Sequence, residues 1–396
     1  MKLIFNRPRE EISHMPFPEE LDNWLEEVSS AFPHLSKPQA QVLGLYSYGM
    51  ALTKHCGQTI VCVFLGLLLK LNCQTLRQRL REFTYEAGGK RGKHRRQIVV
   101  EHQFEALSTW VVKQWAEKKQ IVLAADVTYL KDRHTILTVS VLYGHTAIPV
   151  AWVVLPGNAK GEWHPLWLKL LASLVPALRC VKQVVVLFDR GLYSKRLFLA
   201  VRGYGWHPFM RIREQGSYRR ANRKSWKALK QVAYRGMHPT AFPVHCFKGD
   251  PLAAYLWVQW DGSQAEACLL LSDLAPKQVK GNPYPLRMWI EASFKDWKRG
   301  GLHLEQCKTV DPLRLARLLL VLTLGLFYLI RLGNGLLHSL PSPTDLPSRL
   351  SLTTLGWLHL LVSTVHPTPL HQQAFHPCVL PPFSFPKNLP LKGVGG

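Results

Sequence analysis

The sequence predicts a mixed α/β sheet that carries a β-rich insertion, with a helical domain before it and a helical, proline-rich region after it. Three observations predict this fold class. Helical periodicity dominates up to about residue 118, three β-rich runs follow within 120–156, and helix and strand patterns alternate from residue 164 onward. The chain has 396 residues, of which 47% are apolar, so we expect several folded parts rather than global disorder.

Residues 1–118 are expected to form a helical DNA-binding domain. The stretch Cys62–Phe83 predicts either a helix–turn–helix or an ordinary helix pair, with Asn72 near the turn. Three arginines would lie on the second helix: Arg77, Arg79 and Arg81. The stretch Gly88–Arg96 is rich in glycine and cations, which indicates a basic loop that either lies against phosphates or is simply solvated.

Residues 119–213 and 277–335 are expected to form the sheet domain, interrupted by a β-rich insertion at 214–276. The runs 120–130, 134–145 and 146–156 predict three antiparallel strands of one sheet. Further along, the patterns predict a helix at 164–178, a buried strand at 182–191, a helix at 194–205 and a strand at 206–213. A helical pattern then returns at Pro285 and continues through the apolar segment 313–332.

The apolar run Leu318–Ile330 is flanked by Arg317 and Arg331 and has 13 residues. A membrane-spanning helix needs about 20 apolar residues, so a buried core helix is the expected structure. Residues 336–396 form a tail rich in proline and serine, interrupted by one short helix. We expect this tail to pack loosely or to be disordered, and to be available for contacts with a partner.

The charge of the chain is strongly unbalanced. Lys and Arg number 50 against 26 Asp and Glu, which gives a net charge of +24. Because the cations occur in clusters, a polyanionic partner such as nucleic acid is expected, and neutral sugars are poor substrate candidates. The eight cysteines form no CxxC pair and no zinc-finger spacing, and the N-terminus lacks the apolar stretch of a signal peptide. These features favour a cytoplasmic protein that is not associated with a membrane.

Two aspartates end apolar strand patterns. Asp126 ends "IVLAAD" and Asp189 ends "VVVLFD". A buried acid is costly unless it has a partner, and ligand sites of α/β sheets gather at the carboxyl ends of strands. No cation near Asp126 in the sequence neutralises it, so a metal such as Mg²⁺ is a suitable partner. Each aspartate alone is also compatible with an N-cap or a turn.

The stretch "YPLRMWIEASFKDWKRG" predicts a helix that begins near Pro285. At about 100° per residue, one face of this helix would carry a phenol, a guanidinium, a carboxylate and an ammonium group. The four residues are Tyr284, Arg287, Glu291 and Lys298. The pair Glu291 and Lys295 also fits an ordinary surface salt bridge.

These residues resemble a known family. The spacing Tyr284-x2-Arg287-x3-Glu291-x6-Lys298 is similar to the Tyr–Arg–Glu–Lys signature of DDE transposases from bacterial insertion sequences of the cut-and-paste group. The stretch "AADVTYL" resembles the first acidic strand of that family and "VLFDRGLYS" the second. The resemblance covers roughly residues 115–335. In relatives a tryptophan often follows the signature arginine directly, whereas here Met288 does and Trp289 comes one residue later.

The resemblance implies a ribonuclease H-like sheet in which Asp126, Asp189 and Glu291 are catalytic and ligate two Mg²⁺ ions, with Mn²⁺ able to substitute. One ion would activate a water or a 3′-hydroxyl and the other would stabilise the leaving oxygen. It also implies that Tyr284, Arg287 and Lys298 bind DNA phosphates.

Some relatives stack a flipped base on an aromatic residue of the insertion. Trp226, Trp257 and Trp260 are the candidates here. Trp257 and Trp260 have opposite parity on a strand, so at most one faces DNA if the strand is regular. Both fit equally well as core residues of the insertion.

The expected function is that of a bacterial, nucleoid-associated transposase. It would bind the terminal inverted repeats of its element, cut them and join the 3′ ends to target DNA, acting as a homodimer on paired ends of double-stranded DNA. Two alternatives stay open: a nuclease of the same fold that does not transfer strands, and a catalytically inactive DNA-binding derivative.

Overall fold

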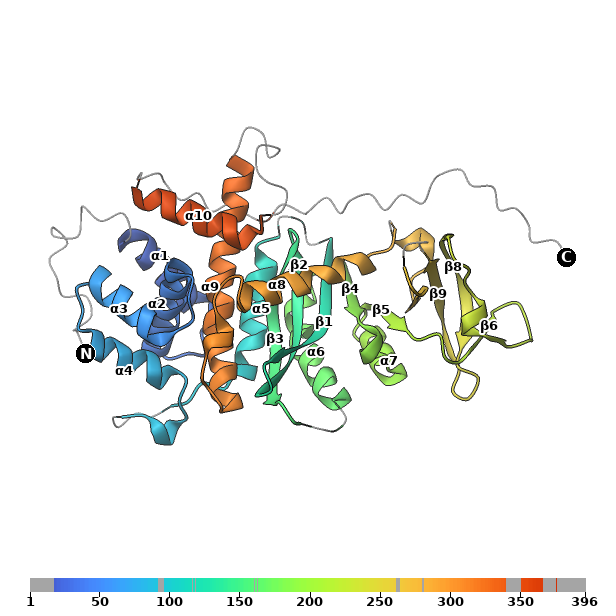
Figure 1. Ribbon diagram of the computed structural model, residues 1–396, viewed down its shortest axis with the longest axis horizontal. Helices are drawn as coiled ribbons and strands as arrows, with labels where there is room; N and C mark the ends of the chain where they lie inside the picture. The colour runs from blue at the N-terminus through green and yellow to red at the C-terminus, as the bar shows by residue number, and fades with distance from the viewer. Residues whose placement is uncertain are drawn as a thin grey trace.

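The computed structural model of the protein describes residues 18–91, 96–115, 117, 119–159, 161, 163–260, 264–279, 281–339, 350–365 and 375. Helices gather at one end of the molecule, and a twisted sheet begins in the middle and continues to the opposite end (Figure 1). Residues 92–95 of the predicted basic loop lie outside the described residues.

The N-terminal part is helical, as predicted. Its helices are α1 (Pro18–Ala31), α2 (Lys37–Thr53), α3 (Gln58–Leu68), α4 (Cys73–Phe83) and α5 (Phe104–Lys113). Asn72 caps α4, because its side-chain oxygen accepts hydrogen bonds from the backbone N–H groups of Gln74 and Thr75, both at 3.0 Å. Helices α3 and α4 are in contact. The predicted helix pair is therefore present, and its use in reading DNA stays a prediction.

The strands of the described residues form one mixed sheet in the order β3-β2-β1-β4-β5-β10-β9-β8-β6-β7. They are β1 (Gln120–Leu130), β2 (His134–Tyr143), β3 (Thr146–Pro156), β4 (Gln183–Phe188), β5 (His207–Ile212), β6 (Ser217–Arg220), β7 (Lys227–Ala228), β8 (Met237–Cys246), β9 (Leu252–Trp260) and β10 (Cys268–Ser272). The antiparallel pairing of β1, β2 and β3 is confirmed, and β1, β4 and β5 run parallel. Because β10 pairs with β5, the β-rich stretch extends the same sheet.

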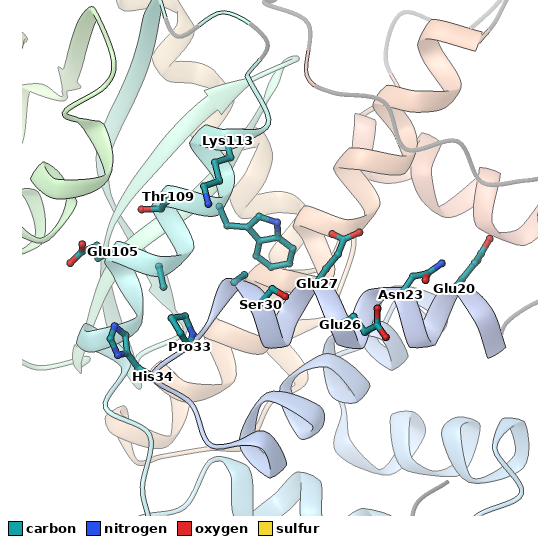
Figure 2. Close-up of a pocket in the computed structure, with 13 residues that line it drawn as sticks. Glu20, Asn23, Glu26, Glu27, Ser30, Pro33, His34, Glu105, Thr109 and Lys113 are labelled. Atoms are coloured by element: carbon teal, nitrogen blue, oxygen red, sulfur yellow. The ribbon is translucent and has the colours of Figure 1, made fainter.

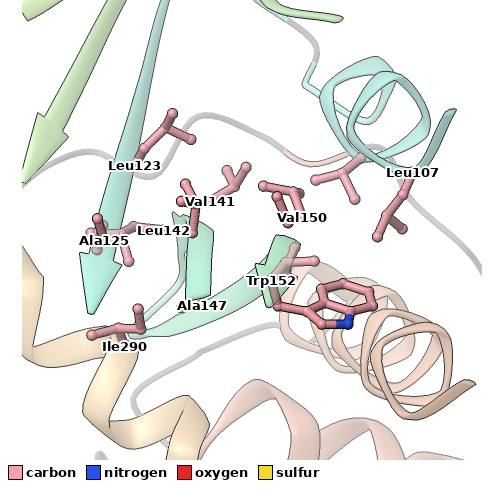
Figure 3. Close-up of a cluster of buried hydrophobic side chains, with 14 of the residues drawn as sticks. Leu107, Leu123, Ala125, Val141, Leu142, Ala147, Val150, Trp152 and Ile290 are labelled. Carbon is pink, nitrogen blue, oxygen red and sulfur yellow. The ribbon is translucent and has the colours of Figure 1, made fainter. Parts of the chain in front are cut away.

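Helices cover both faces of the sheet. They are α6 (His164–Leu178), α7 (Lys195–Gly203) and α8 (Met288–Trp297). Helix α8 contacts β1, β2 and β3, whereas α6 contacts β2 and β3 together with α5; Figure 1 shows α8 in front of the strands and α6 behind them. Leu123 of β1, Val141 of β2 and Ile290 of α8 are buried parts of one hydrophobic core, in which Ile290 lies near Ala125 and Ala147 (Figure 3).

Short 3-10 turns connect many of these elements. They span Ala87–Gly89, Val100–Gln103, Arg190–Leu192, Leu229–Gln231, Pro276–Gln278, Tyr284–Arg287 and Leu304–Gln306. The turn at Tyr284–Arg287 leads directly into α8, so it fixes how that helix approaches the sheet.

The apolar segment Leu318–Ile330 forms the middle of α9 (Pro312–Ser339). By length and apolar character α9 could cross a membrane, but 83% of its most apolar window is buried inside the protein. It packs against α2, against α10 (Leu352–Val365) and against β3. The prediction of a buried core helix is confirmed.

The short helix predicted within the C-terminal tail is present, and the described parts of the tail are packed, which corrects the prediction of loose packing or disorder at these positions. Helix α10 (Leu352–Val365) lies across α9. Phe375 is fully buried, forms a β-bridge with Trp115 and stacks on Tyr143 with ring centroids 4.3 Å apart. Residues 340–349, 366–374 and 376–396 of the predicted tail lie outside the described residues.

A groove of about 860 Å³ lies between α1 and α5, and carboxylates dominate its charged lining (Figure 2). Burial, with a smaller contribution from Glu19, raises the pKa of Glu20 in this groove from 4.5 to about 7. Among the described residues, one carboxylate oxygen of Glu20 is buried and has no hydrogen-bond partner. The folded state therefore favours the protonated form of this side chain.

Replacing Glu20 with glutamine is expected to change how stability depends on pH. Between about pH 4.5 and 7 the folded wild-type protein binds more protons than the unfolded chain, so its stability falls as the pH rises. At pH 8 the free energy of unfolding of the variant should exceed that of wild type by on the order of 1 kcal/mol, since Glu20 is only partly buried. At pH 4 the two proteins should have the same free energy of unfolding. Denaturant unfolding at both pH values measures this. Glu26→Gln, exposed on the same helix, is the control; an equal gain at pH 4 and pH 8 for Glu20→Gln would contradict the explanation.

Candidate active site

Asp126 and Asp189 lie side by side in the sheet. Strands β1 and β4 are parallel, and Ala125 is the register partner of Phe188. Asp126 directly follows Ala125 and Asp189 directly follows Phe188, so the two aspartates are neighbours across the strands. Asp189 directly follows β4, as predicted. The predicted strand 120–130 is confirmed as β1 (Gln120–Leu130), so Asp126 ends the apolar run but lies within the strand rather than at its carboxyl end. Strand β1 runs four residues past Asp126. It continues because β2 keeps pairing with it, up to the pair Leu130 and His134, after β4 has ended.

The Asp126 carboxylate is largely buried, with its side chain 16% exposed. One oxygen accepts a hydrogen bond from the backbone N–H of Val127 at 2.8 Å, and the other accepts one from Arg287 at 2.7 Å. Burial raises the pKa of Asp126 above its usual range, and the nearby carboxylates of Asp189 and Glu291 act in the same direction, while Arg287 opposes them. The three predicted acids are therefore electrostatic neighbours.

The segment that carries Glu291 is not one continuous helix, which corrects the prediction. It begins as the 3-10 turn Tyr284–Arg287, continues as α8 and ends at Lys298, which has φ −88° and ψ −126°. The chain then folds back, because the Asp296 carbonyl accepts a hydrogen bond from the backbone N–H of Leu302 at 2.7 Å. This turn requires glycine at 301, where a Cβ would lie 2.0 Å from the Asp296 oxygen.

Two of the signature residues contact the acids. The Tyr284 hydroxyl donates to Asp189 Oδ1 at 3.3 Å. Arg287 donates through Nη1 to Asp126 Oδ2 at 2.7 Å and through Nη2 to Glu291 Oε1 at 2.8 Å. Although burial alone would lower it, the pKa of Arg287 is raised because the Asp126 carboxylate and further negative groups lie against it. Arg287 thus joins one acid of the sheet to the acid of α8.

Lys298 contacts Thr128 and none of the three acids. Its ammonium group donates to Thr128 Oγ1 at 2.8 Å. Burial lowers the pKa of Lys298. Thr128 was not among the predicted site residues, yet a sequence signal for it exists: it lies two residues after Asp126 on a strand, so both side chains are on the same face of the sheet.

Met288 and Trp289 mark the departure from the family signature. Met288 is 55% exposed. Trp289 packs its ring against His145, at the turn between β2 and β3, with ring centroids 4.8 Å apart. The shift of tryptophan by one position therefore directs its ring to this turn.

The donor set suits a hard divalent cation. Three carboxylates from β1, the end of β4 and α8 converge, and Mg²⁺ prefers carboxylate oxygens. In the part of the chain that the structure describes, no three Asp, Glu, His or Cys side chains are arranged tightly enough to ligate one ion as they stand. The Arg287 guanidinium lies between Asp126 and Glu291 and bonds to both.

The tryptophans of the β-rich stretch differ in environment. Trp257 is 3% exposed, packs against Phe209 and donates to the Leu274 carbonyl at 3.3 Å, so it is a core residue. Trp260 is partly exposed and donates to the Gln264 carbonyl. Trp226 lies under the Arg219 guanidinium, 5.5 Å from the ring centroid. The structure therefore excludes Trp257 as an exposed stacking surface.

The sequence model of the family described as "Transposase DDE domain" matches residues 128–327, half of the chain. The chain belongs to the DDE transposase family. The matched region contains Asp189, Glu291 and all three predicted DNA-contacting residues, and it begins two residues after Asp126.

The other comparisons add little to this assignment. No curated protein matches the chain. Among solved structures, this DDE transposase is similar to the "cryo-EM structure of piggyBac transposase synaptic complex with hairpin DNA", with 9% identity and a TM-score of 0.38 over 88% of this chain and 78% of that one. A similarity at this level carries no argument about function.

Proposed function

We propose that this DDE transposase serves a bacterial insertion sequence of the cut-and-paste group with the Tyr–Arg–Glu–Lys signature. It binds the terminal inverted repeats of its element, hydrolyses a phosphodiester at each end and joins the freed 3′-hydroxyls to target DNA. One observation carries the proposal: residues of a single segment, 284–291, form hydrogen bonds to the two sheet aspartates. Tyr284 and Arg287 of the signature thus form one hydrogen-bonded cluster with the two aspartates.

A ribonuclease H-like assignment of the sheet is part of the proposal. An antiparallel unit of β3, β2 and β1, continued by the parallel strands β4 and β5, supports it. So does the position of the acids, which lie where β4 ends beside β1.

The residues that would hold divalent cations are Asp126, Asp189 and Glu291. Mg²⁺ or Mn²⁺ bound there would supply Lewis-acid stabilisation and an activated attacking oxygen. The protein itself contributes the placement of the three carboxylates on rigid elements and a partly buried setting, in which charges interact more strongly than in water.

The cations of the segment would position DNA. Arg287 has a planar fork of donors that suits a phosphate, and Lys298 is a point charge that Thr128 holds on the same face as Asp126. Tyr284 would donate its hydroxyl to a phosphate oxygen. The net charge of +24 supports binding of double-stranded DNA, and two copies of the chain would hold the two ends together.

Joining of DNA ends distinguishes a transposase from its alternatives. Full-length protein is incubated with Mg²⁺, a target plasmid and pre-cut duplexes that carry the element end and a free 3′-hydroxyl. Covalently joined plasmid is expected, and duplexes ending in a dideoxynucleotide should give none. Cleavage of uncut ends without joining would instead indicate a nuclease, and binding without cleavage would indicate an inactive derivative.

A further inference from the structure

Arg287 is in direct contact with two of the three acids. Its two terminal nitrogens lie 2.7 Å from Asp126 and 2.8 Å from Glu291, and its side chain is only 12% exposed. Two other cations of the segment are engaged elsewhere: Lys298 contacts Thr128, and Arg299 pairs with Glu305. In the described part of the chain, Arg287 is therefore the guanidinium that neutralises this acid pair.

A guanidinium and a divalent cation oppose each other at the same carboxylates. Each carboxylate has enough lone pairs to accept a hydrogen bond from arginine and to ligate a metal ion at the same time. The two positive groups would then be a few ångströms apart in a partly buried site, where their repulsion is weakly screened. Removal of the guanidinium from Asp126 and Glu291 should therefore strengthen cation binding.

A DNA phosphate gives the guanidinium another partner. Arginine binds phosphate through two parallel hydrogen bonds, as it does a carboxylate. The Arg287 Nη2 atom lies 4.0 Å from the sulfur of Met288, which is 55% exposed, and its partner Glu291 has a side chain that is 42% exposed, so the guanidinium borders the protein surface.

We propose that Arg287 couples DNA binding to metal binding. Without DNA it holds Asp126 and Glu291 as a resting counterion; a DNA phosphate draws it away and releases both carboxylates for the cation. This inference rests on the proposed function. Because linkage is reciprocal, the cation must strengthen DNA binding by the same factor. Arg287 therefore acts as a positioning residue. It keeps the affinity of the site for divalent cations low until DNA is bound.

The affinity for Mn²⁺ tests the coupling without relying on activity. Free Mn²⁺ is measured by electron paramagnetic resonance with full-length protein, alone and with a pre-cut end duplex that has a dideoxy terminus and cannot be joined. For wild type, the duplex should raise the affinity on the order of tenfold. Arg287→Gln should bind Mn²⁺ on the order of tenfold more tightly than wild type without DNA, and the duplex should add little.

Two further variants sharpen the result. Arg299→Gln removes one positive charge from the same segment without touching the acids, so both affinities should stay close to wild type. Arg287→Lys keeps the charge but reaches one carboxylate only, so its affinity without DNA should lie between those of wild type and Arg287→Gln, which preserves the test if the glutamine variant folds poorly.

The outcomes separate the inference from the proposed function. Weaker Mn²⁺ binding by Arg287→Gln without DNA, or no effect of the duplex on wild type, would overturn the coupling while the acids remain metal ligands. A wild-type protein that binds no Mn²⁺ in either condition would overturn the proposed function and the coupling with it.

Discussion

Replacing Asp126, Asp189 or Glu291 singly with alanine is expected to reduce cleavage of the element ends by roughly a thousandfold or more, because each change removes an oxygen ligand from a site whose cations stabilise the transition state. Single-turnover cleavage of a labelled end duplex measures the loss. The Asp126 variant is the most informative, since the family match begins after this residue and its assignment depends on the pairing of β1 with β4.

A matched control is Glu305→Ala, which removes a carboxylate that follows α8 but pairs with Arg299 outside the acid cluster. It should cleave at close to the wild-type rate. All variants should still bind the duplex and unfold cooperatively. Normal cleavage by Glu291→Ala, with unchanged DNA binding, would show that the metal site has been assigned to the wrong residues.

Replacing Gly356 with alanine is expected to destabilise the protein by about 2 to 3 kcal/mol. Helices α9 and α10 cross so closely that a Cβ at Gly356 would lie 1.8 Å from the Leu329 carbonyl oxygen, and one at Gly333 would lie 2.0 Å from the Leu352 carbonyl oxygen. Backbone atoms cannot move aside as side-chain ends can, so the two helices must separate. Denaturant unfolding measures the change in stability.

Gly203→Ala is the control for that substitution. Gly203 ends α7, and a Cβ there would meet no atom within 4 Å. This change should be neutral or stabilising by about 0.5 kcal/mol, because alanine loses less backbone entropy than glycine. Equal stability of the two variants would mean that α9 and α10 do not cross as described.

Local patterns predicted much of the fold. The helix His164–Leu178 has the predicted bounds, and β1 to β5 occur where continuous or β-rich apolar runs predict them. These elements are set by side-chain periodicity, which is visible in a sequence. The Gly333 and Gly356 contact was not predicted, because it depends on two helices that meet only in the folded chain.

The sequence predicted which residues belong to the candidate site, but not how their side chains contact one another. Asp126 could be predicted as a site residue because it follows a run of apolar residues. The extension of β1 past Asp126 depends on pairing with β2, which is a non-local interaction. Arg287 was predicted to bind phosphate, whereas in the structure it contacts Asp126 from 161 residues away along the chain. No local spacing predicts such a partner, so its effect on cation binding became evident only from the three-dimensional arrangement.

We expect Asp126, Asp189 and Glu291 to bind divalent cations together when DNA is bound. Anomalous diffraction from crystals of the full chain, bound to a pre-cut end duplex with a dideoxy terminus and soaked in Mn²⁺, tests it most directly. We expect anomalous peaks within coordination distance of all three carboxylates, with Arg287 turned toward a DNA phosphate. Peaks held by other residues, or a DNA-bound site in which these three acids ligate no Mn²⁺, would contradict it.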